Sequence, residues 1–197
     1  MNEAIAIDLF VEDQAHERFL AAFVERMLRE EQRAGFLRVR AARGGHSRAI
    51  AEFNNYQRIV EKDGLPAPGL VIVAIDANCS PFTRARRLVQ EAVRPTFVDK
   101  TVVACPDPHI ERWFLADPTS FGEVVGTRPR VRRRKCKRAL YKDLLARSVV
   151  EGGHPPTLGG IEFSRELVDA MDLFRAGKAE PSLKHFTDSL RAQIRSQ

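Results

Sequence analysis

The sequence predicts an α/β protein with a largely parallel four-stranded sheet, flanked by helices and followed by a C-terminal helical extension. Up to about residue 105, four short apolar runs alternate with amphipathic helical segments, which is the order that a parallel sheet requires. The run GLVIVAID at 69–76 is apolar on both faces, as expected for a strand in the middle of such a sheet. From residue 135 onward the pattern is helical or loop-like.

The first half of the alternation contains two strands and two helices. Residues 4–11, AIAIDLFV, form an apolar run with one acid, which favours a buried strand. Asp13 can cap the helix that follows, because its side chain can accept a hydrogen bond from a free backbone N–H of the first turn. Residues 36–40 predict a second strand. Ser47 can cap a second helix, which runs to about Asp63 before the breaker GLPAPG.

The second half supplies the other two strands and the C-terminal helices. After the strand at 69–76, a helix begins with Ser80 as its cap and Pro81 at its first position. Residues 100–105, KTVVAC, predict the fourth strand. Further helices are expected at 135–150, 163–177 and 181–197. We expect residues 1–127 to form the α/β domain, and 128–197 to form a basic segment and helices packed on it as one compact unit.

Composition narrows the class of protein. The chain has 197 residues and no run of 18 apolar residues, so one domain and no membrane span are expected. The N-terminus lacks the basic-then-apolar order of a secretion signal, and a sparse, odd cysteine count fits a reducing cytosol, so we expect a cytoplasmic protein. A zinc site has little support, because the spacing of the candidate ligands matches no standard zinc module. These candidates are Cys79, Cys105, Cys136 and His109.

The positive charge is concentrated in one segment. The net charge is +6, and residues 128–138, RPRVRRRKCKR, hold eight Lys or Arg and no acid. Such a segment attracts polyanions, so DNA or RNA is the expected partner. The plainer alternative is a solvated loop. The candidate nucleic-acid contacts are Arg128, Arg130, Arg132, Arg133, Arg134, Lys135, Lys137 and Arg138.

Acidic and amide side chains follow three of the four predicted strands. Glu12 follows the first strand, with Glu17 one helical turn further on; Asp76 ends the third, with Asn78 two residues later; Glu111 follows the fourth. The carboxyl ends of parallel strands meet at one edge, where ligands gather. Clustered carboxylates repel one another unless a cation neutralises them, and oxygen ligands suit Mg²⁺ or Mn²⁺. The sequence therefore predicts a metal site at this edge.

Each of these acids also has a plainer interpretation. Glu12 and Asp76 can cap the helices that follow them, Glu17 can face solvent, and Glu111 can be an ordinary first-turn helix acid.

Three nearby residues are expected in supporting roles. Trp113 is predicted to pack in the core rather than stack on a base. His16 and His109 are expected to be surface groups or groups that support the ligands.

Three stretches carry a resemblance to a known family. IDLFVEDQAHERFL and VIVAIDAN resemble the first two motifs of Toprim (topoisomerase–primase) domains. CPDPHIERWFLADP at 105–118 is similar to the E-x-W-L-L-A-D signature of small stand-alone Toprim-like proteins, which lie near the overcoming-lysogenisation-defect (OLD) nucleases of bacterial anti-phage defence. CKRALYKDLLA and EPSLKHFTDSLRAQI resemble their C-terminal helices, so the resemblance covers nearly the whole chain.

The resemblance implies roles for the matching residues. Glu12 would be the acid of the first motif, a metal ligand or base, and Asp76 the metal-ligating first Asp of the second motif. Glu111 would be the acid of the third motif. Two positions depart from the family pattern: Asn78 stands where the second Asp is expected, and Asp13 where a Gly often follows the first acid.

The implied function is a Mg²⁺-dependent nuclease that cleaves phosphodiesters of DNA or RNA. Such proteins work with an ABC-type or SMC-like ATPase, which would be encoded separately because this chain has no ATPase motif. A homodimer of this chain is a further assembly that stays open. Two other functions stay open. The first is a catalytically inactive Toprim-like subunit that binds nucleic acid or has a regulatory role, which would agree with Asn78 in place of a metal-binding acid. The second is an α/β adaptor that binds protein alone.

Overall fold

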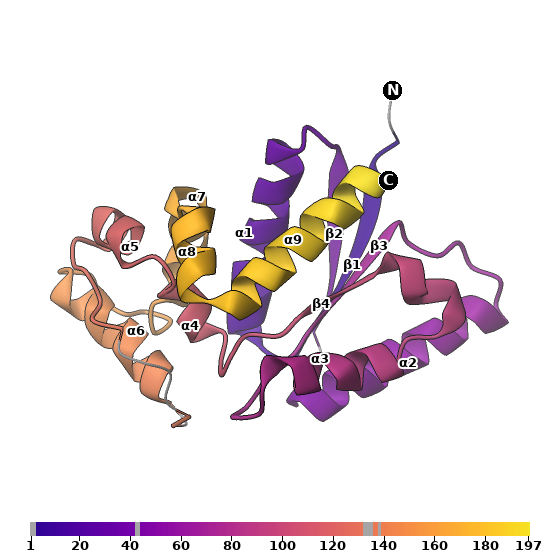
Figure 1. Cartoon of the computed structure of the whole chain (residues 1–197), viewed down its shortest axis with the longest axis horizontal. Coiled ribbons are helices and arrows are strands. Elements are labelled where there is room, and N and C mark those ends of the chain that lie inside the picture. The colour runs from indigo at the N-terminus through magenta and orange to yellow at the C-terminus, as the bar shows by residue number, and fades with distance from the viewer. Residues whose placement is uncertain (1–2, 42–43, 132–135, 138) are drawn as a thin grey trace.

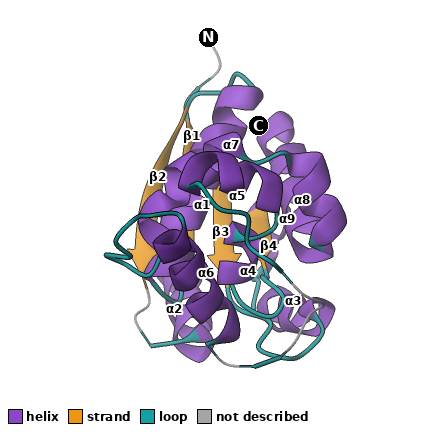
Figure 2. Cartoon of the chain, turned by 90° about the vertical axis from the view of Figure 1, so that its left-hand side faces the viewer, coloured by secondary structure: helices purple, strands orange, loops and turns teal. Residues whose placement is uncertain are grey.

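The computed structural model describes residues 3–41, 44–131, 136–137 and 139–197. Its centre is a four-stranded sheet in the order β2-β1-β3-β4, in which every neighbouring pair is parallel. Figure 2 shows β2 at one edge of this sheet and β4 at the other. The prediction of an α/β protein with a parallel four-stranded sheet is confirmed. The strands are β1 (Ile5–Val11), β2 (Gly35–Ala41), β3 (Leu70–Ala74) and β4 (Thr101–Ala104).

Helices cover both faces of the sheet (Figure 1). On one face, α1 (Gln14–Glu30) packs on β1 and β2, and α9 (Pro181–Ser196) packs on β4. On the other face, α2 (His46–Lys62) packs on β1 and β3, and α3 (Phe82–Glu91) packs on β4. All five residues of β3 are buried, because both of its faces are covered.

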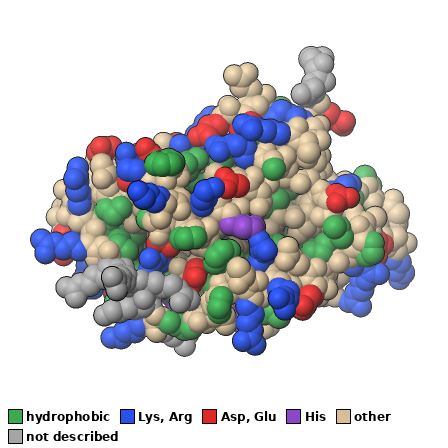
Figure 3. Space-filling view, in the orientation of Figure 1, with side chains coloured by type: hydrophobic (Ala, Val, Ile, Leu, Met, Phe, Trp, Pro, Cys, Tyr) green, Lys and Arg blue, Asp and Glu red, His purple; other side chains and the backbone are tan. Residues whose placement is uncertain are grey.

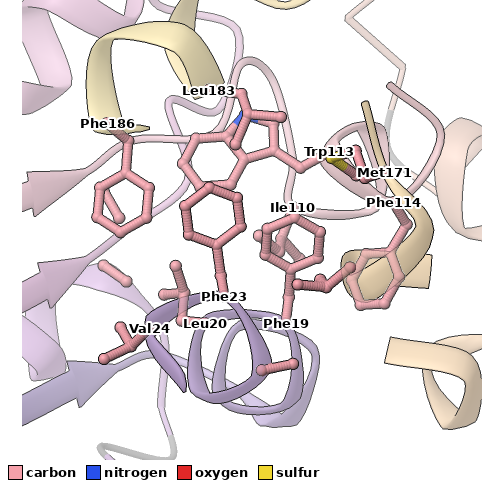
Figure 4. Close-up of a cluster of buried hydrophobic side chains, with 14 of the residues drawn as sticks. Phe19, Leu20, Phe23, Val24, Ile110, Trp113, Phe114, Met171, Leu183 and Phe186 are labelled. Carbon is pink, nitrogen blue, oxygen red and sulfur yellow. The ribbon is translucent and has the colours of Figure 1, made fainter. Parts of the chain in front are cut away.

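A set of aromatic side chains joins the sheet to the C-terminal helices. Trp113 is fully buried, its ring stacks on Phe186 with 5.5 Å between centroids, and its Nε1 donates to Ser182 Oγ at 2.9 Å. Figure 4 shows Phe19 and Phe23 of α1 pointing into the same cluster. The prediction that Trp113 packs in the core is confirmed.

The remaining helices lie beyond the end of β4. Among the described residues of the segment expected to be helical at 135–150, the helix begins at Leu140, and the helix expected at 163–177 is divided in two. Among the described residues, no helix combines the length and apolar content needed to cross a lipid bilayer. These elements are α4 (Glu111–Phe114), α5 (Pro118–Val125), α6 (Leu140–Glu151), α7 (Ser164–Ala170) and α8 (Leu173–Ala179), with the 3₁₀ helix η2 (Ile161–Phe163). Another 3₁₀ helix, η1 (Pro95–Lys100), comes directly before β4.

The break between α7 and α8 has partners that are distant in sequence. Arg26 Nη1 in α1 donates to the carbonyl oxygens of Val168 and Met171 at 2.6 and 2.7 Å, which satisfies the end of α7. Asp172 then caps α8 by accepting from Arg175 N at 2.9 Å, and its own N–H donates to Asp117 Oδ2. Helical periodicity continues through this point, so it cannot reveal the break.

Helix starts agree with the predictions in one case and differ in two. Asp13 caps α1, because its side chain accepts from His16 N. Helix α2 begins one residue before Ser47, after Gly45, whose φ of 81° suits glycine. Helix α3 begins at Phe82, with Pro81 in the cap position.

Candidate metal centre

The candidate site lies where β1 and β3 end side by side. These strands are paired in register, with Val11 opposite Ala74. Glu12 therefore follows directly on one strand while Asp76 follows shortly after the other. The two residues are in contact, since Asp76 N donates to Glu12 Oε1 at 3.2 Å. The parallel topology thus brings the two predicted acids together.

Two histidines flank Asp76. His16, in the first turn of α1, is fully buried, and its Nε2 lies 3.1 Å from Asp76 Oδ1. Its other ring nitrogen, Nδ1, lies 2.8 Å from Asp13 Oδ1. His109, in the loop after β4, places its Nδ1 3.1 Å from Asp76 Oδ2. An imidazole therefore faces each carboxylate oxygen of Asp76.

Four polar atoms of this cluster lack a hydrogen-bond partner. Within the described part of the chain, they are buried and unpaired: Glu12 Oε2, His16 Nε2, Asp76 Oδ1 and His109 Nε2. The 3.1 Å separation of His16 and Asp76 is short enough for an ion pair, but the two atoms are not aligned as a hydrogen bond. An unpaired buried polar group costs about 1–3 kcal/mol, so four of them at one place indicate a site built for another atom.

Three residues of this cluster are close enough to share one ion. Glu12, His16 and Asp76 each offer one ligand atom, and these atoms lie within 4.8 Å of one another. Two carboxylate oxygens and one imidazole nitrogen are donors that divalent metals accept. The residues therefore fit a divalent cation.

The pKa values follow from burial and from these neighbours. Burial raises the pKa of Glu12 to about 7, although the charge of His16 opposes this. Burial alone would lower the pKa of His16, but the charge of Asp76 and the contact with Asp13 raise it well above its ordinary value. Burial would raise the pKa of Asp76, but His16 and His109 lower it. The acids of this site therefore need a nearby positive charge to stay ionised.

The other predicted ligands lie at different distances from this centre. Asn78 and Glu111 line a cleft of about 580 Å³ that also includes Asp76 and His109. Burial raises the pKa of Glu111. Asn78 is exposed, and its side-chain amide donates to Asp76 O at 3.4 Å. Glu17 is half-buried on α1 and lies outside the group formed by Glu12, His16 and Asp76.

Cationic side chains adjoin the acidic centre on two sides. Lys142 lines the cleft with Glu111. A second cleft, of about 260 Å³, shares Asp76 and Asn78 and is lined by His46 and Arg84. On the face shown in Figure 3, Lys and Arg side chains are interspersed with acids rather than gathered in one patch.

The basic run reaches the cleft through a covalent bond. Cys136, within the run, forms a disulfide with Cys79, which lines the cleft next to Asn78. Nothing in the cysteine spacing predicts this bond, and Cys105 is a buried free thiol. Arg128, Arg130 and Lys137 are exposed. The other predicted contacts lie outside the described residues: Arg132, Arg133, Arg134, Lys135 and Arg138.

His16 is the residue of this cluster whose position the sequence does not predict. It is fully buried rather than a surface group. The available signal is the spacing Asp13-x-x-His16 directly after Glu12, which puts both side chains on the first turn of one helix.

No protein-family model, curated protein or solved structure matches the chain.

Proposed function

We propose that this protein is a Toprim-like, divalent-metal-dependent nuclease that hydrolyses phosphodiester bonds of DNA or RNA. The observation that carries the proposal is the set of buried, unpaired atoms of Glu12, His16 and Asp76 at the carboxyl edge of a parallel sheet. That edge is where α/β proteins bind ligands. Mg²⁺ or Mn²⁺ is the proposed cofactor, held by Glu12 and Asp76.

The surrounding side chains have complementary roles. When bound, a divalent ion would neutralise charge on the phosphoryl oxygens and acidify a bound water. Lys142 and Arg84, on the two clefts that adjoin Asp76, would hold the phosphates on either side of the scissile bond. The cations of 128–138 would extend this contact along the backbone, since Cys136 is bonded to the wall of the cleft. Such contacts position a nucleic acid without reading its sequence.

The proposed biological setting follows from the family resemblance. The chain would be the effector subunit of a phage-defence system, paired with a separately encoded ABC-type or SMC-like ATPase. This part of the proposal is supported by the signature at 105–118 and by the lack of an ATPase motif in the chain.

A cleavage assay tests the activity. The substrates are duplex DNA, single-stranded DNA, tRNA and mixed RNA, each with Mg²⁺, Mn²⁺ or EDTA. Asp76→Asn is expected to lower metal-dependent cleavage by more than about 100-fold, because it removes the charge of a proposed metal ligand and so weakens the ion that would neutralise the phosphoryl oxygens. Glu17→Gln, in the first turn of α1 but outside the group of close ligand atoms, is the matched control and should cleave like the wild type. Undiminished cleavage by both Glu12→Gln and Asp76→Asn would contradict the proposal.

One observation favours a second function, that of a catalytically inactive subunit that binds nucleic acid. Asn78 stands where the family pattern has an acid, and its exposed amide contacts the backbone of Asp76. The site then has one carboxylate fewer for a second ion. Salt-sensitive binding to DNA or RNA with no metal-dependent cleavage of any substrate would favour this function.

A further inference from the structure

We infer that the site binds its ion partly through nitrogen, with His16 Nε2 as a ligand beside Glu12 Oε2 and Asp76 Oδ1, so that it prefers a transition metal over Mg²⁺. The inference rests on the metal site of the proposed function and specifies its cofactor. It assigns a ligand role to His16 and a positioning role to Asp13.

Asp13 orients the ring of His16. Its Oδ1 accepts from His16 N at 3.0 Å and lies 2.8 Å from His16 Nδ1. A carboxylate accepts hydrogen bonds and cannot donate one, so Nδ1 carries a proton in this contact. The neutral ring then has its lone pair on Nε2, the atom that faces Asp76. Metal-binding histidines in proteins are held in this way, by a carboxylate on the nitrogen that does not bind the metal.

A protonated His16 completes the cluster only in part, so an ion that binds here would displace a proton from Nε2. An imidazolium would supply positive charge between Asp13 and Asp76, and Nε2 would then donate to Asp76 Oδ1. The two atoms are 3.1 Å apart but are not aligned for that hydrogen bond. Glu12 Oε2 would also remain buried without a partner. One ion could complete the cluster, because Glu12, His16 and Asp76 each offer a ligand atom within 4.8 Å of the others.

The donor set determines which ions are favoured. Mg²⁺ prefers oxygen ligands in a near-ideal octahedron and gives up its waters reluctantly. Imidazole nitrogen suits Zn²⁺ and other first-row transition metals, whose affinity rises from Mn²⁺ through Co²⁺ for a given site. A site of two carboxylates and one imidazole should therefore bind Mn²⁺ and Co²⁺ more tightly than Mg²⁺.

His109 is the natural comparison within the same site. Its Nδ1 lies 3.1 Å from Asp76 Oδ2, on the opposite oxygen from His16, and it is not in the group of three close ligand atoms. It is expected to support Asp76 without binding the ion. His109→Gln is therefore a matched control for His16→Gln.

The decisive experiment detects nitrogen on the bound ion. The intact protein is loaded with Mn²⁺, and pulsed electron paramagnetic resonance is recorded with ¹⁴N- and ¹⁵N-histidine labelling. We expect coupling to one directly bound imidazole nitrogen in the wild type and in His109→Gln, and its loss in His16→Gln. Bound Mn²⁺ without nitrogen coupling in the wild type overturns the inference, and this reading needs no variant to fold. Coupling that persists in His16→Gln also overturns it.

Metal titrations measure the preference and the role of Asp13. In calorimetry, Mn²⁺ and Co²⁺ should bind the wild type at least about tenfold more tightly than Mg²⁺, because imidazole nitrogen suits these ions and Mg²⁺ prefers oxygen ligands. Asp13→Asn can still cap α1, so the helix should persist, while Mn²⁺ affinity falls about tenfold. Equal affinities for Mg²⁺ and Mn²⁺, or no binding of Mn²⁺ at all, contradict the inference.

The same samples separate this inference from the nuclease proposal. Nitrogen coupling without cleavage of any substrate would support His16 as a metal ligand and contradict the proposed nuclease activity. Metal-dependent cleavage without nitrogen coupling keeps the nuclease and overturns the ligand assignment.

Discussion

Glu12 and Asp117 are both buried carboxylates, but they are satisfied very differently. Asp117 is 3 % exposed and accepts from Ser120 Oγ and Asp172 N at 2.7 and 2.9 Å, and from Arg175 through both of its oxygens. Glu12 is 9 % exposed, yet it accepts one hydrogen bond through Oε1 and, among the described residues, none through Oε2. The two carboxylates are thus similarly buried, but only Asp117 has hydrogen-bond partners for both of its oxygens.

The pKa values of the two residues move in opposite directions. Burial alone would raise the pKa of Asp117, but its hydrogen bonds from Arg175, Ser120 and Asp172 lower it to about 2. Burial raises the pKa of Glu12 to about 7, and the opposing charge of His16 is too small to reverse this. The carboxylate of Asp117 is thus stabilised by partners within the fold, whereas that of Glu12 lacks such partners, as the proposed cation site would require.

The largest expected effect is on stability at Asp117. Asp117→Ala should lower the free energy of unfolding by about 3 kcal/mol, because it leaves the buried hydroxyl of Ser120 and the N–H of Asp172 without their acceptor. Urea denaturation measures this. Asp169→Ala is the control, since Asp169 pairs with Arg29 at the surface, and its loss should cost less than about 1 kcal/mol. Equal effects of the two substitutions would contradict the role given to Asp117.

The second prediction concerns pH and the same residue. The folded pKa of Asp117, about 2, lies below its ordinary value of 3.8, so its contribution is present above about pH 4 and is lost as the pH falls through 2. That difference in pKa corresponds to about 2 kcal/mol. The stability gap between the wild type and Asp117→Asn should therefore narrow between pH 4 and pH 2 in urea titrations. A gap that stays constant over this range would be evidence against the assignment.

The third prediction concerns Glu12, where we expect a substitution not to lower the free energy of unfolding as Asp117→Ala does. Glu12→Gln removes a buried charge that has one hydrogen-bond donor and leaves an amide of the same shape. The free energy of unfolding in EDTA should stay within about 1 kcal/mol of the wild type or rise, as happens when a functional site is neutralised. A loss as large as that of Asp117→Ala would mean that Glu12 is structural.

The smallest expected effect is at Glu17. It lies on the same helix as His16 but outside the group of close ligand atoms. Glu17→Gln should change the free energy of unfolding by less than about 0.5 kcal/mol and leave Mn²⁺ affinity unchanged in calorimetry. A tenfold loss of affinity would extend the site along α1.

The sequence predicts the part of the site that topology determines. Parallel strands must end at the same edge, so Glu12 and Asp76 could be placed together from their positions after two apolar runs. The core position of Trp113 and the capping role of Asp13 were also within reach of residue type and spacing.

The features that the sequence does not predict depend on contacts between segments that are distant in sequence. The buried His16 contacts Asp76, which lies just after β3, and the break at Met171 involves contacts with Arg26 and Asp117. The approach of Cys136 to Cys79 joins residues 57 positions apart. Local periodicity contains no information about such pairs, so neither the histidine nor the helix break could be predicted from it.

A Mn²⁺ titration followed by thermal unfolding tests the central claim most directly. Binding to the folded state alone stabilises it by RT ln(1 + [L]/Kd), which is about 2.7 kcal/mol at a free concentration 100 times Kd. We predict a concentration-dependent rise in Tm for the wild type and for Asp117→Asn, and its loss in Asp76→Asn. No rise for the wild type at millimolar Mn²⁺, or an equal rise in Asp76→Asn, would contradict a metal site at Glu12, His16 and Asp76.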